Sequence, residues 1–118
     1  MFATLYILGI TAHLFADFFL QNEWQATRKN DLSGPAGWVH AALHLLCLWP
    51  VFGFQVAFLL AVIHLLIDTR IPLQLWRKTI KQTNDPANPA FMPFAMLQDQ
   101  AAHLICIAIA AYAVSERL

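Results

Sequence analysis

The sequence has few charged residues, and this scarcity excludes an ordinary soluble domain. Charged side chains make up 12% of the 118 residues, about half the share of an average soluble domain, whereas hydrophobic residues make up 59%. Only two cysteines are present, and both fall in apolar stretches, which excludes a disulfide framework. The sequence also lacks internal repeats, low-complexity tracts and a linker, so we expect one domain over residues 1–118.

Long apolar runs are what the sequence has in abundance. They cover residues 1–20, 37–67 and 91–114. About 20 helical residues cross a bilayer, so the first and last runs each fit one span. The middle run is too long for one span and contains Trp49–Gly53, which predicts a tight turn. The pattern therefore predicts an all-α, polytopic membrane protein, a four-helix up-down transmembrane bundle. Its expected spans are residues 2–21, 35–51, 54–69 and 93–114.

The segments outside these spans predict a polar loop and an interfacial helix. Asn22–Gly34 is polar, and Ser33 before Pro35 is typical of an N-cap for the second span. In residues 70–84, apolar positions at helical spacing alternate with basic ones, which is typical of a helix lying in the membrane interface. Met1–Leu20 has no basic region before its apolar run, so we expect a retained span rather than a signal peptide.

Basic residues are unevenly divided between the two sides of the expected bundle. Six of the seven lie in the two long loops, and Arg117 alone lies on the other side. Cytoplasmic loops are enriched in Lys and Arg, so the pattern places both loops in the cytoplasm and both termini outside. We expect a multi-pass protein of the bacterial inner membrane. The lipid bilayer is its expected partner, no nucleic acid is expected, and the oligomeric state is left open.

Each expected span carries one pair of His or Asp residues four positions apart. The pairs are His13 with Asp17, His40 with His44, His64 with Asp68, and Asp99 with His103. Residues at this spacing share a helix face, and the up-down topology places all eight side chains in the cytoplasmic half. The expected deeper layer is His13, His44, His64 and His103, and the shallower layer is Asp17, His40, Asp68 and Asp99.

A bound metal ion would explain why these side chains occur within spans, and the alternatives are a metal-free hydrogen-bonded or proton-relay network and a haem. A charged residue at the bilayer centre costs about 2.5–3.5 kcal/mol on insertion scales, so three aspartates need compensation there. Carboxylates and neutral imidazoles are natural ligands of divalent cations, and helical bundles bind metals between facing helices. We therefore expect the eight residues to bind one or two divalent ions, with zinc as the first choice and iron or manganese as alternatives. Around these ligands, or against a substrate, we expect Gln21, Gln100 and Arg70.

Several functions remain open on this pattern. The leading hypothesis is a metal-dependent hydrolase in which Asp99 acts as a general base towards water. Its substrate would be a lipid or lipid-linked molecule that enters from the cytoplasmic leaflet. The alternatives are a metal or proton transporter subunit, a di-iron or haem redox protein, and a protein whose ion is only structural. The outer half of the spans offers few polar residues, which disfavours transport.

Four motifs resemble the small bacterial membrane proteins catalogued as domain of unknown function 3307. They are HLFADFFLQ, HAALH, HLLID with a basic residue soon after it, and DQAAH, and the resemblance covers nearly the whole chain. It implies that the family-motif positions are Asp17, Gln21, His40, His64, Asp68, Asp99, Gln100 and His103. Arg70 stands where the family more often has lysine. A looser similarity to proteins labelled membrane-bound metal-dependent hydrolases implies metal binding and hydrolysis without fixing a substrate.

Overall fold

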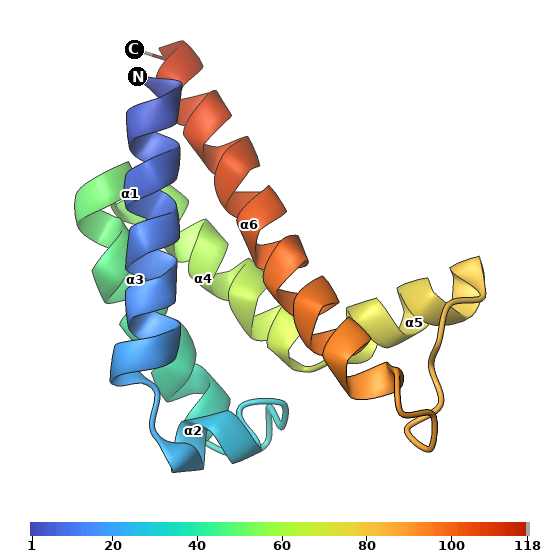
Figure 1. Cartoon of the computed structure of the whole chain (residues 1–118). Helices are drawn as coiled ribbons and strands as arrows, with labels where there is room; N and C mark the ends of the chain where they lie inside the picture. The colour runs from blue at the N-terminus through green and yellow to red at the C-terminus, as the bar shows by residue number, and fades with distance from the viewer. Residues whose placement is uncertain (118) are drawn as a thin grey trace.

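The computed structural model describes residues 1–117, which are mostly helical and contain no strand. The predicted all-α class is therefore confirmed. The long helices are α1 (Phe2–Phe15), α3 (Ala36–Phe52), α4 (Phe54–Asp68) and α6 (Phe91–Arg117). They run alternately in opposite directions, so the first and last described residues lie at the same end of the molecule (Figure 1). The short elements are the π-helix η1 (Ala16–Leu20), α2 (Glu23–Arg28) and α5 (Ile71–Ile80).

Two helical segments are long and apolar enough to cross a membrane. They are Phe2–Leu20, which joins α1 to η1, and α6. Together α4 and α5 also qualify, but the chain bends by 62° between them, so they give a third span only if they form one broken span. Helix α3 is apolar but has only 17 residues. Membrane association is thus supported, whereas the four-span bundle remains a prediction.

The turn between α3 and α4 is shorter than the sequence indicated. Helix α3 continues through Pro50 to Phe52, and only Gly53 interrupts it, with φ at 84°. Glycine adopts this left-handed conformation readily because it has no Cβ. The turn predicted over Trp49–Gly53 is therefore wrong for its first four residues. Phe52 belongs to the buried core, so packing holds the last helical turn in place although Pro50 lacks a backbone donor.

The segment after η1 also differs from the predicted polar loop. It contains α2, whose N-cap residue Asn22 accepts a hydrogen bond from the Gln25 N–H at 2.9 Å. The predicted N-cap role of Ser33 is wrong, because its hydroxyl instead donates to Asp31 Oδ1 at 2.6 Å. This bond and a second one from the Ser33 backbone N–H hold the pKa of Asp31 below its usual value. Helix α3 begins after Pro35 with no side-chain cap.

The long helices bury two different layers along their shared inner surface. The layer nearer the termini is an apolar core made of Leu5, Leu48, Phe52, Ala57, Leu60, Ile107, Ala110 and Ala111. Its small residues allow close helix packing, and a Cβ placed on Gly9 of α1 would lie 2.7 Å from Ile107 of α6. The second layer lies further along the same helix faces and contains buried His and Asp side chains.

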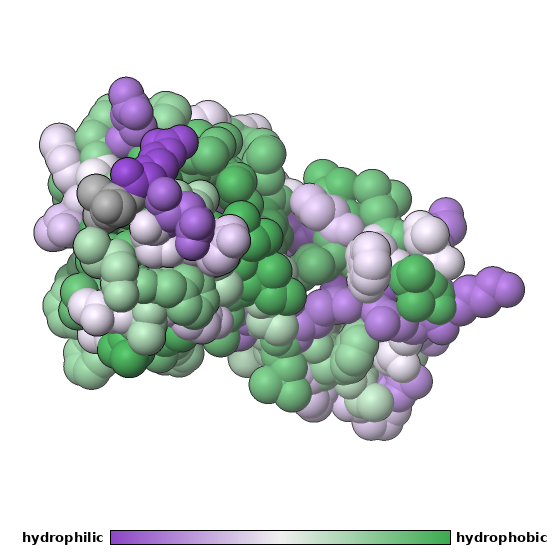
Figure 2. Space-filling model, turned by 90° about the horizontal axis from the view of Figure 1, so that it is seen from above, coloured by the Kyte–Doolittle hydropathy of each residue, from purple (hydrophilic) through white to green (hydrophobic). Residues whose placement is uncertain are grey.

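The outer surface of the long helices is largely hydrophobic (Figure 2). Ile7, Leu59 and Ile109 are each more than half exposed, as expected for side chains that face lipid. Hydrophilic residues gather at the upper left of Figure 2 and on the arm formed by α5 and the loop that follows it, on the right. The arm itself is amphipathic, because Ile71, Leu75, Trp76 and Ile80 are exposed while Arg77 is buried.

Candidate metal centre

All five histidines meet in the second buried layer. Each is at most 4% exposed, and they come from α1, α3, α4 and α6. The ring centroids of His44 and His64 lie 3.7 Å apart, and those of His64 and His103 lie 4.2 Å apart. The ring centroid of His13 lies 5.0 Å from that of His44 and 5.1 Å from that of His103, so the four residues form a closed circle. The four histidines of the expected deeper layer therefore contact one another, as the spacing of their pairs predicted.

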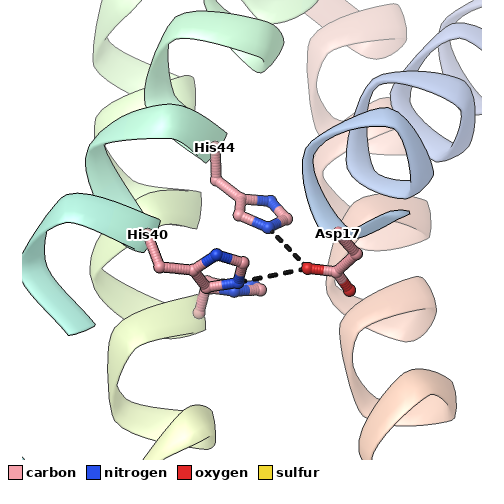
Figure 3. Close-up of side chains that lie close together, drawn as sticks. Asp17, His40 and His44 are labelled. Carbon is pink, nitrogen blue, oxygen red and sulfur yellow. Dashed lines mark hydrogen bonds and ion pairs between the residues drawn. The ribbon is translucent and has the colours of Figure 1, made fainter. Parts of the chain in front are cut away.

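Asp17 binds this layer from the π-helix at the end of the first span. Its Oδ1 lies 2.9 Å from Nε2 of His44 and 3.1 Å from Nε2 of His40 (Figure 3). Its Oδ2 lies 3.3 Å from Nε2 of His13 and accepts a hydrogen bond from Gln100 at 3.2 Å. π-Helices are rare and occur frequently at functional sites, so the local geometry itself marks this position.

Asp68 occupies the opposite side of the cluster, at the end of α4. Its Oδ2 lies 2.8 Å from Nε2 of His64 and 3.6 Å from Nε2 of His40. Its Oδ1 lies 3.7 Å from Nε2 of His103 and 3.9 Å from Nζ of Lys29. Three imidazole nitrogens from three helices thus surround one carboxylate that is 3% exposed.

The contacts between Asp68 and these three nitrogens do not have the geometry of hydrogen bonds. The Nε2 atoms of His40, His64 and His103 are fully buried and have no hydrogen-bond partner within residues 1–117. Asp68 Oδ1 is also fully buried and has no hydrogen-bond partner among these residues. Nδ1 of His44 is a fifth such atom. Buried polar atoms are normally paired, so these five unpartnered atoms require an explanation. Bare nitrogen lone pairs and a carboxylate repel one another unless a proton or a metal cation lies between them.

In two of these histidines, a hydrogen bond from Nδ1 leaves Nε2 of the neutral ring without a proton. His103 donates from Nδ1 to the backbone oxygen of Asp99 at 2.8 Å, and Nδ1 of His40 lies 3.1 Å from Gln25 Oε1. A neutral imidazole that donates from Nδ1 presents a lone pair at Nε2. This arrangement is the usual one for a histidine that binds a metal.

The donor atoms fall into two overlapping groups that fit a divalent cation. One contains Asp17, His40, His44 and His64, and the other contains His64, Asp68 and His103. Within each group the ligand atoms lie within 4.8 Å of one another, and His64 belongs to both. Buried His and Asp groups in this arrangement could hold a metal ion. A neutral imidazole binds one ion, so His64 can serve one of the two groups at a time. The identity of the ion remains a prediction.

The remaining predicted residues surround the cluster. Gln100 Oε1 lies 3.1 Å from Nε2 of His13, and its amide nitrogen binds Asp17. Gln21 accepts a hydrogen bond from Lys29 at 3.0 Å and so orients that lysine near Asp68. His13 and Asp99, two of the predicted ligands, lie outside both donor groups. Oδ2 of Asp99 lies 3.6 Å from Nδ1 of His103, and the Asp99 side chain is 26% exposed. Its role as a ligand or a base remains a prediction.

Sequence reasoning missed two residues of this site. Gln25 of α2 is 4% exposed, and its amide also donates to the backbone oxygen of Leu20 at 3.4 Å. Lys29 follows α2 and reaches Asp68 from outside the bundle. Both lie in the segment that was expected to be a loop. The sequence signal for α2 was Asn22 followed by Glu23, a favourable N-cap and first-turn pair.

A cleft of about 650 Å³ leads from the surface to the carboxylates of the cluster. It runs between the end of η1, the junction of α4 with α5, and the start of α6. Asp17, Asp68 and Asp99 all line it, and so do three basic residues, Lys29, Arg70 and Arg77. The rest of the wall is mainly apolar. Gln21, Gln100 and Arg70, the predicted contacts around the ligands or substrate, all line this cleft.

Comparison with known proteins places this arrangement in a family. The family model described as "Protein of unknown function (DUF3307)" matches residues 5–117. The chain belongs to the DUF3307 family. Among curated proteins and solved structures, none matches this DUF3307 protein. The similarity to membrane-bound metal-dependent hydrolases is not shown by these comparisons. The match spans all four long helices, and therefore every residue of the candidate metal centre.

Proposed function

We propose that this DUF3307 protein is a membrane-embedded hydrolase that uses a divalent metal ion, with zinc as the first choice. Its substrate would be a lipid or lipid-linked molecule that enters from the cytoplasmic leaflet. The observation that carries the proposal is the set of three unpartnered Nε2 atoms around Asp68. Removing charged groups from water is expensive unless they are paired, and a divalent cation compensates both buried carboxylates at once.

The surrounding residues have distinct chemical roles in this proposal. A divalent ion held in the cluster supplies Lewis-acid polarisation of a substrate oxygen. Asp99 lies at the cleft wall beside the ligands, so it can accept a proton from a water molecule that attacks the substrate. Gln25 and the backbone of Asp99 fix the tautomers of their histidines. Lys29 places a positive charge at the edge of the cluster, where negative charge develops in the reacting group.

Access to the cluster favours catalysis over a purely structural ion. A structural site is normally closed by protein ligands, whereas a catalytic site keeps an open position. Here the histidines are enclosed, but all three carboxylates of the spans line the cleft. Transport is disfavoured for a different reason. The apolar core lies beyond the histidine layer towards the termini, so no row of polar side chains continues through it.

Metal content tests the proposal directly. The full chain is purified in neutral detergent without chelator, and elemental analysis gives the ions per chain. We expect one or two divalent ions in the native protein and loss of at least one in Asp68→Asn, which keeps the shape of the side chain but removes its charge. Asp85→Asn is the matched control, because Asp85 lies in a loop outside the cluster. Full metal content in Asp68→Asn, or no ion in the native protein after loading, would contradict the proposal.

Hydrolysis requires a second measurement on the same preparations. Metal-loaded protein is incubated with amphiphilic p-nitrophenyl esters and with bis-p-nitrophenyl phosphate. We expect release of nitrophenol that chelator abolishes and that Asp99→Asn lowers by roughly 100-fold or more while metal content is kept. If Asp99→Asn loses the metal together with activity, Asp99 is a ligand rather than the base. If the loaded native protein hydrolyses none of these probes, the ion is assigned a structural role.

A further inference from the structure

Arg77 of α5 is the most enclosed cation outside the metal cluster. Its side chain faces α6 and is part of a residue that is only 3% exposed. Nε donates to Asn84 at 3.0 Å and Nη1 donates to Gln98 at 2.9 Å, and Gln98 in turn donates to Gln82. The guanidinium carbon lies 5.4 Å from the ring centroid of Phe91. Neutral amides and an aromatic face therefore hold the group in one position.

No acidic side chain neutralises this charge. Within residues 1–117 the one ion pair made by a Lys or Arg joins Lys29 to Asp68, so Arg77 has no carboxylate partner. A buried guanidinium without an anion is costly, and proteins seldom retain one without a use for it. Its Nη2 makes no hydrogen bond to the described residues and is not among their fully enclosed polar atoms. This end of the guanidinium is thus left available to the cleft that Arg77 lines.

The cleft joins Arg77 to the metal cluster and to an apolar wall. Arg70 lies at the bend between α4 and α5, and Lys29 lies beside Asp68 at the inner end. The apolar wall comes from α5 and the first turns of α6, and it consists of Leu73, Phe91, Met92, Met96 and Leu97. Met96 and Leu97 are 63% and 72% exposed, so this wall continues onto the outer surface of α6, which is hydrophobic.

We propose that the cleft binds the phosphate group of an amphiphilic molecule, with Arg77 donating to the phosphate oxygens. The inference rests on the proposed function, for which it names the class of substrate. Three carboxylates also line this cleft, and Lys29 lies beside one of them, whereas Arg70 and Arg77 have no acidic partner within residues 1–117. These two arginines suit a phosphate group, because the guanidinium fork matches the geometry of phosphate oxygens. The apolar wall accommodates the hydrocarbon chain, which enters sideways from the bilayer. Free phosphate would use the same cations but not this wall.

Binding is tested on the full chain in neutral detergent after removal of metal with EDTA, so that no metal ion contributes to phosphate binding. Dodecyl phosphate is titrated calorimetrically at one fixed detergent concentration, and inorganic phosphate is titrated in parallel. We expect dodecyl phosphate to bind the native protein and to bind Arg77→Gln about tenfold more weakly or worse. Lys78→Gln is the matched control, because Lys78 is exposed on the same helix and does not line the cleft. Its affinity should stay within about twofold of the native value.

Two further variants keep the inference testable if Arg77→Gln fails to fold. Arg70→Gln changes an exposed residue of the cleft and should weaken binding several-fold. Met96→Trp narrows the apolar wall and should weaken dodecyl phosphate without changing the affinity for inorganic phosphate. Unchanged binding in Arg77→Gln, or in both further variants, overturns the inference and assigns Arg77 to holding α5 against α6. If the native protein binds dodecyl phosphate and inorganic phosphate with equal affinity, the ligand is not an amphiphile and the cleft is a site for free phosphate.

The outcome is separable from that of the proposed function. Metal content is measured on the same preparations before EDTA treatment. Arg77-dependent binding of dodecyl phosphate in a chain that never holds metal would refute the hydrolase and keep the phosphate site. Metal content and hydrolysis that survive while Arg77→Gln binds normally would refute the phosphate site alone.

Discussion

At the scale of single residues, the histidines depend on partners that lie outside the metal cluster. Gln25 is the clearest example, because it contacts His40 from α2, a helix that contributes no predicted ligand. Its Oε1 fixes the proton of His40 on Nδ1, so that Nε2 faces both buried carboxylates. Without an acceptor at this position the ring can rotate or change tautomer, and the lone pair is lost from the cluster.

Replacing Gln25 should therefore weaken metal binding without removing any ligand. We expect Gln25→Leu to lower metal affinity by roughly 10- to 100-fold, and Gln25→Glu, which retains an acceptor oxygen, to lower it less. Affinity is measured by competition with a chelator of known strength. Gln55→Leu is the control, because Gln55 is exposed at the far end of α4. Equal affinities in Gln25→Leu and the control would show that His40 needs no fixed tautomer.

At the scale of elements, the close contact between α3 and the loop after α2 positions Lys29. A Cβ on Gly37 would lie 2.7 Å from the backbone oxygen of Lys29 and 3.4 Å from Leu65. The first contact is with backbone, which cannot move aside as the end of a side chain can. Gly37 therefore lets the loop approach α3 closely enough for Lys29 to reach Asp68.

We expect Gly37→Ala to destabilise the fold by about 1–3 kcal/mol, because the added methyl group overpacks this contact. Gly34→Ala is a matched control three residues away, where an added Cβ meets nothing within 4 Å. Stability is compared by unfolding both variants in mixed micelles with increasing denaturing detergent. A helical glycine also gains propensity on change to alanine, which works in the opposite direction. If Gly37→Ala is as stable as Gly34→Ala, the loop moves freely and Lys29 is not held by this contact.

The elements also show which features can be predicted from sequence. Pairs four residues apart share a helix face, so the convergence of the histidines follows from local geometry and an up-down topology. The end of α3 was mispredicted because tertiary packing of Phe52 outweighs the local effect of Pro50. Gln25 could not be assigned a role, because it acts on a histidine of a different helix. The π-helix at Asp17 has no simple sequence signal at all.

At the scale of the whole molecule, the orientation predicted from the basic residues determines which side of the membrane the cleft would face. The bend of 62° after α4 turns α5 away from the bundle, and the arm carries four basic residues, Arg70, Arg77, Lys78 and Lys81. The opposite end of the molecule holds the first and last described residues and the apolar core (Figure 1). An arm lying along the cytoplasmic surface would open the cleft towards the inner leaflet. The number of spans then depends on whether the hairpin of α3 and α4 crosses fully.

Cysteine labelling in intact bacterial cells distinguishes these topologies. In a background of Cys47→Ala and Cys106→Ala, a membrane-impermeant maleimide should label Glu116→Cys directly and Thr79→Cys only after lysis, because basic loops stay in the cytoplasm. Trp49→Cys, near the turn at Gly53, reports on the hairpin. Labelling from outside is expected for four spans, since α3 has 17 residues and reaches about 25 Å, close to the bilayer thickness. If Trp49→Cys is labelled neither in intact cells nor after lysis, the hairpin ends inside the membrane. If Thr79→Cys is labelled in intact cells, the orientation is reversed and the cleft faces the outer leaflet.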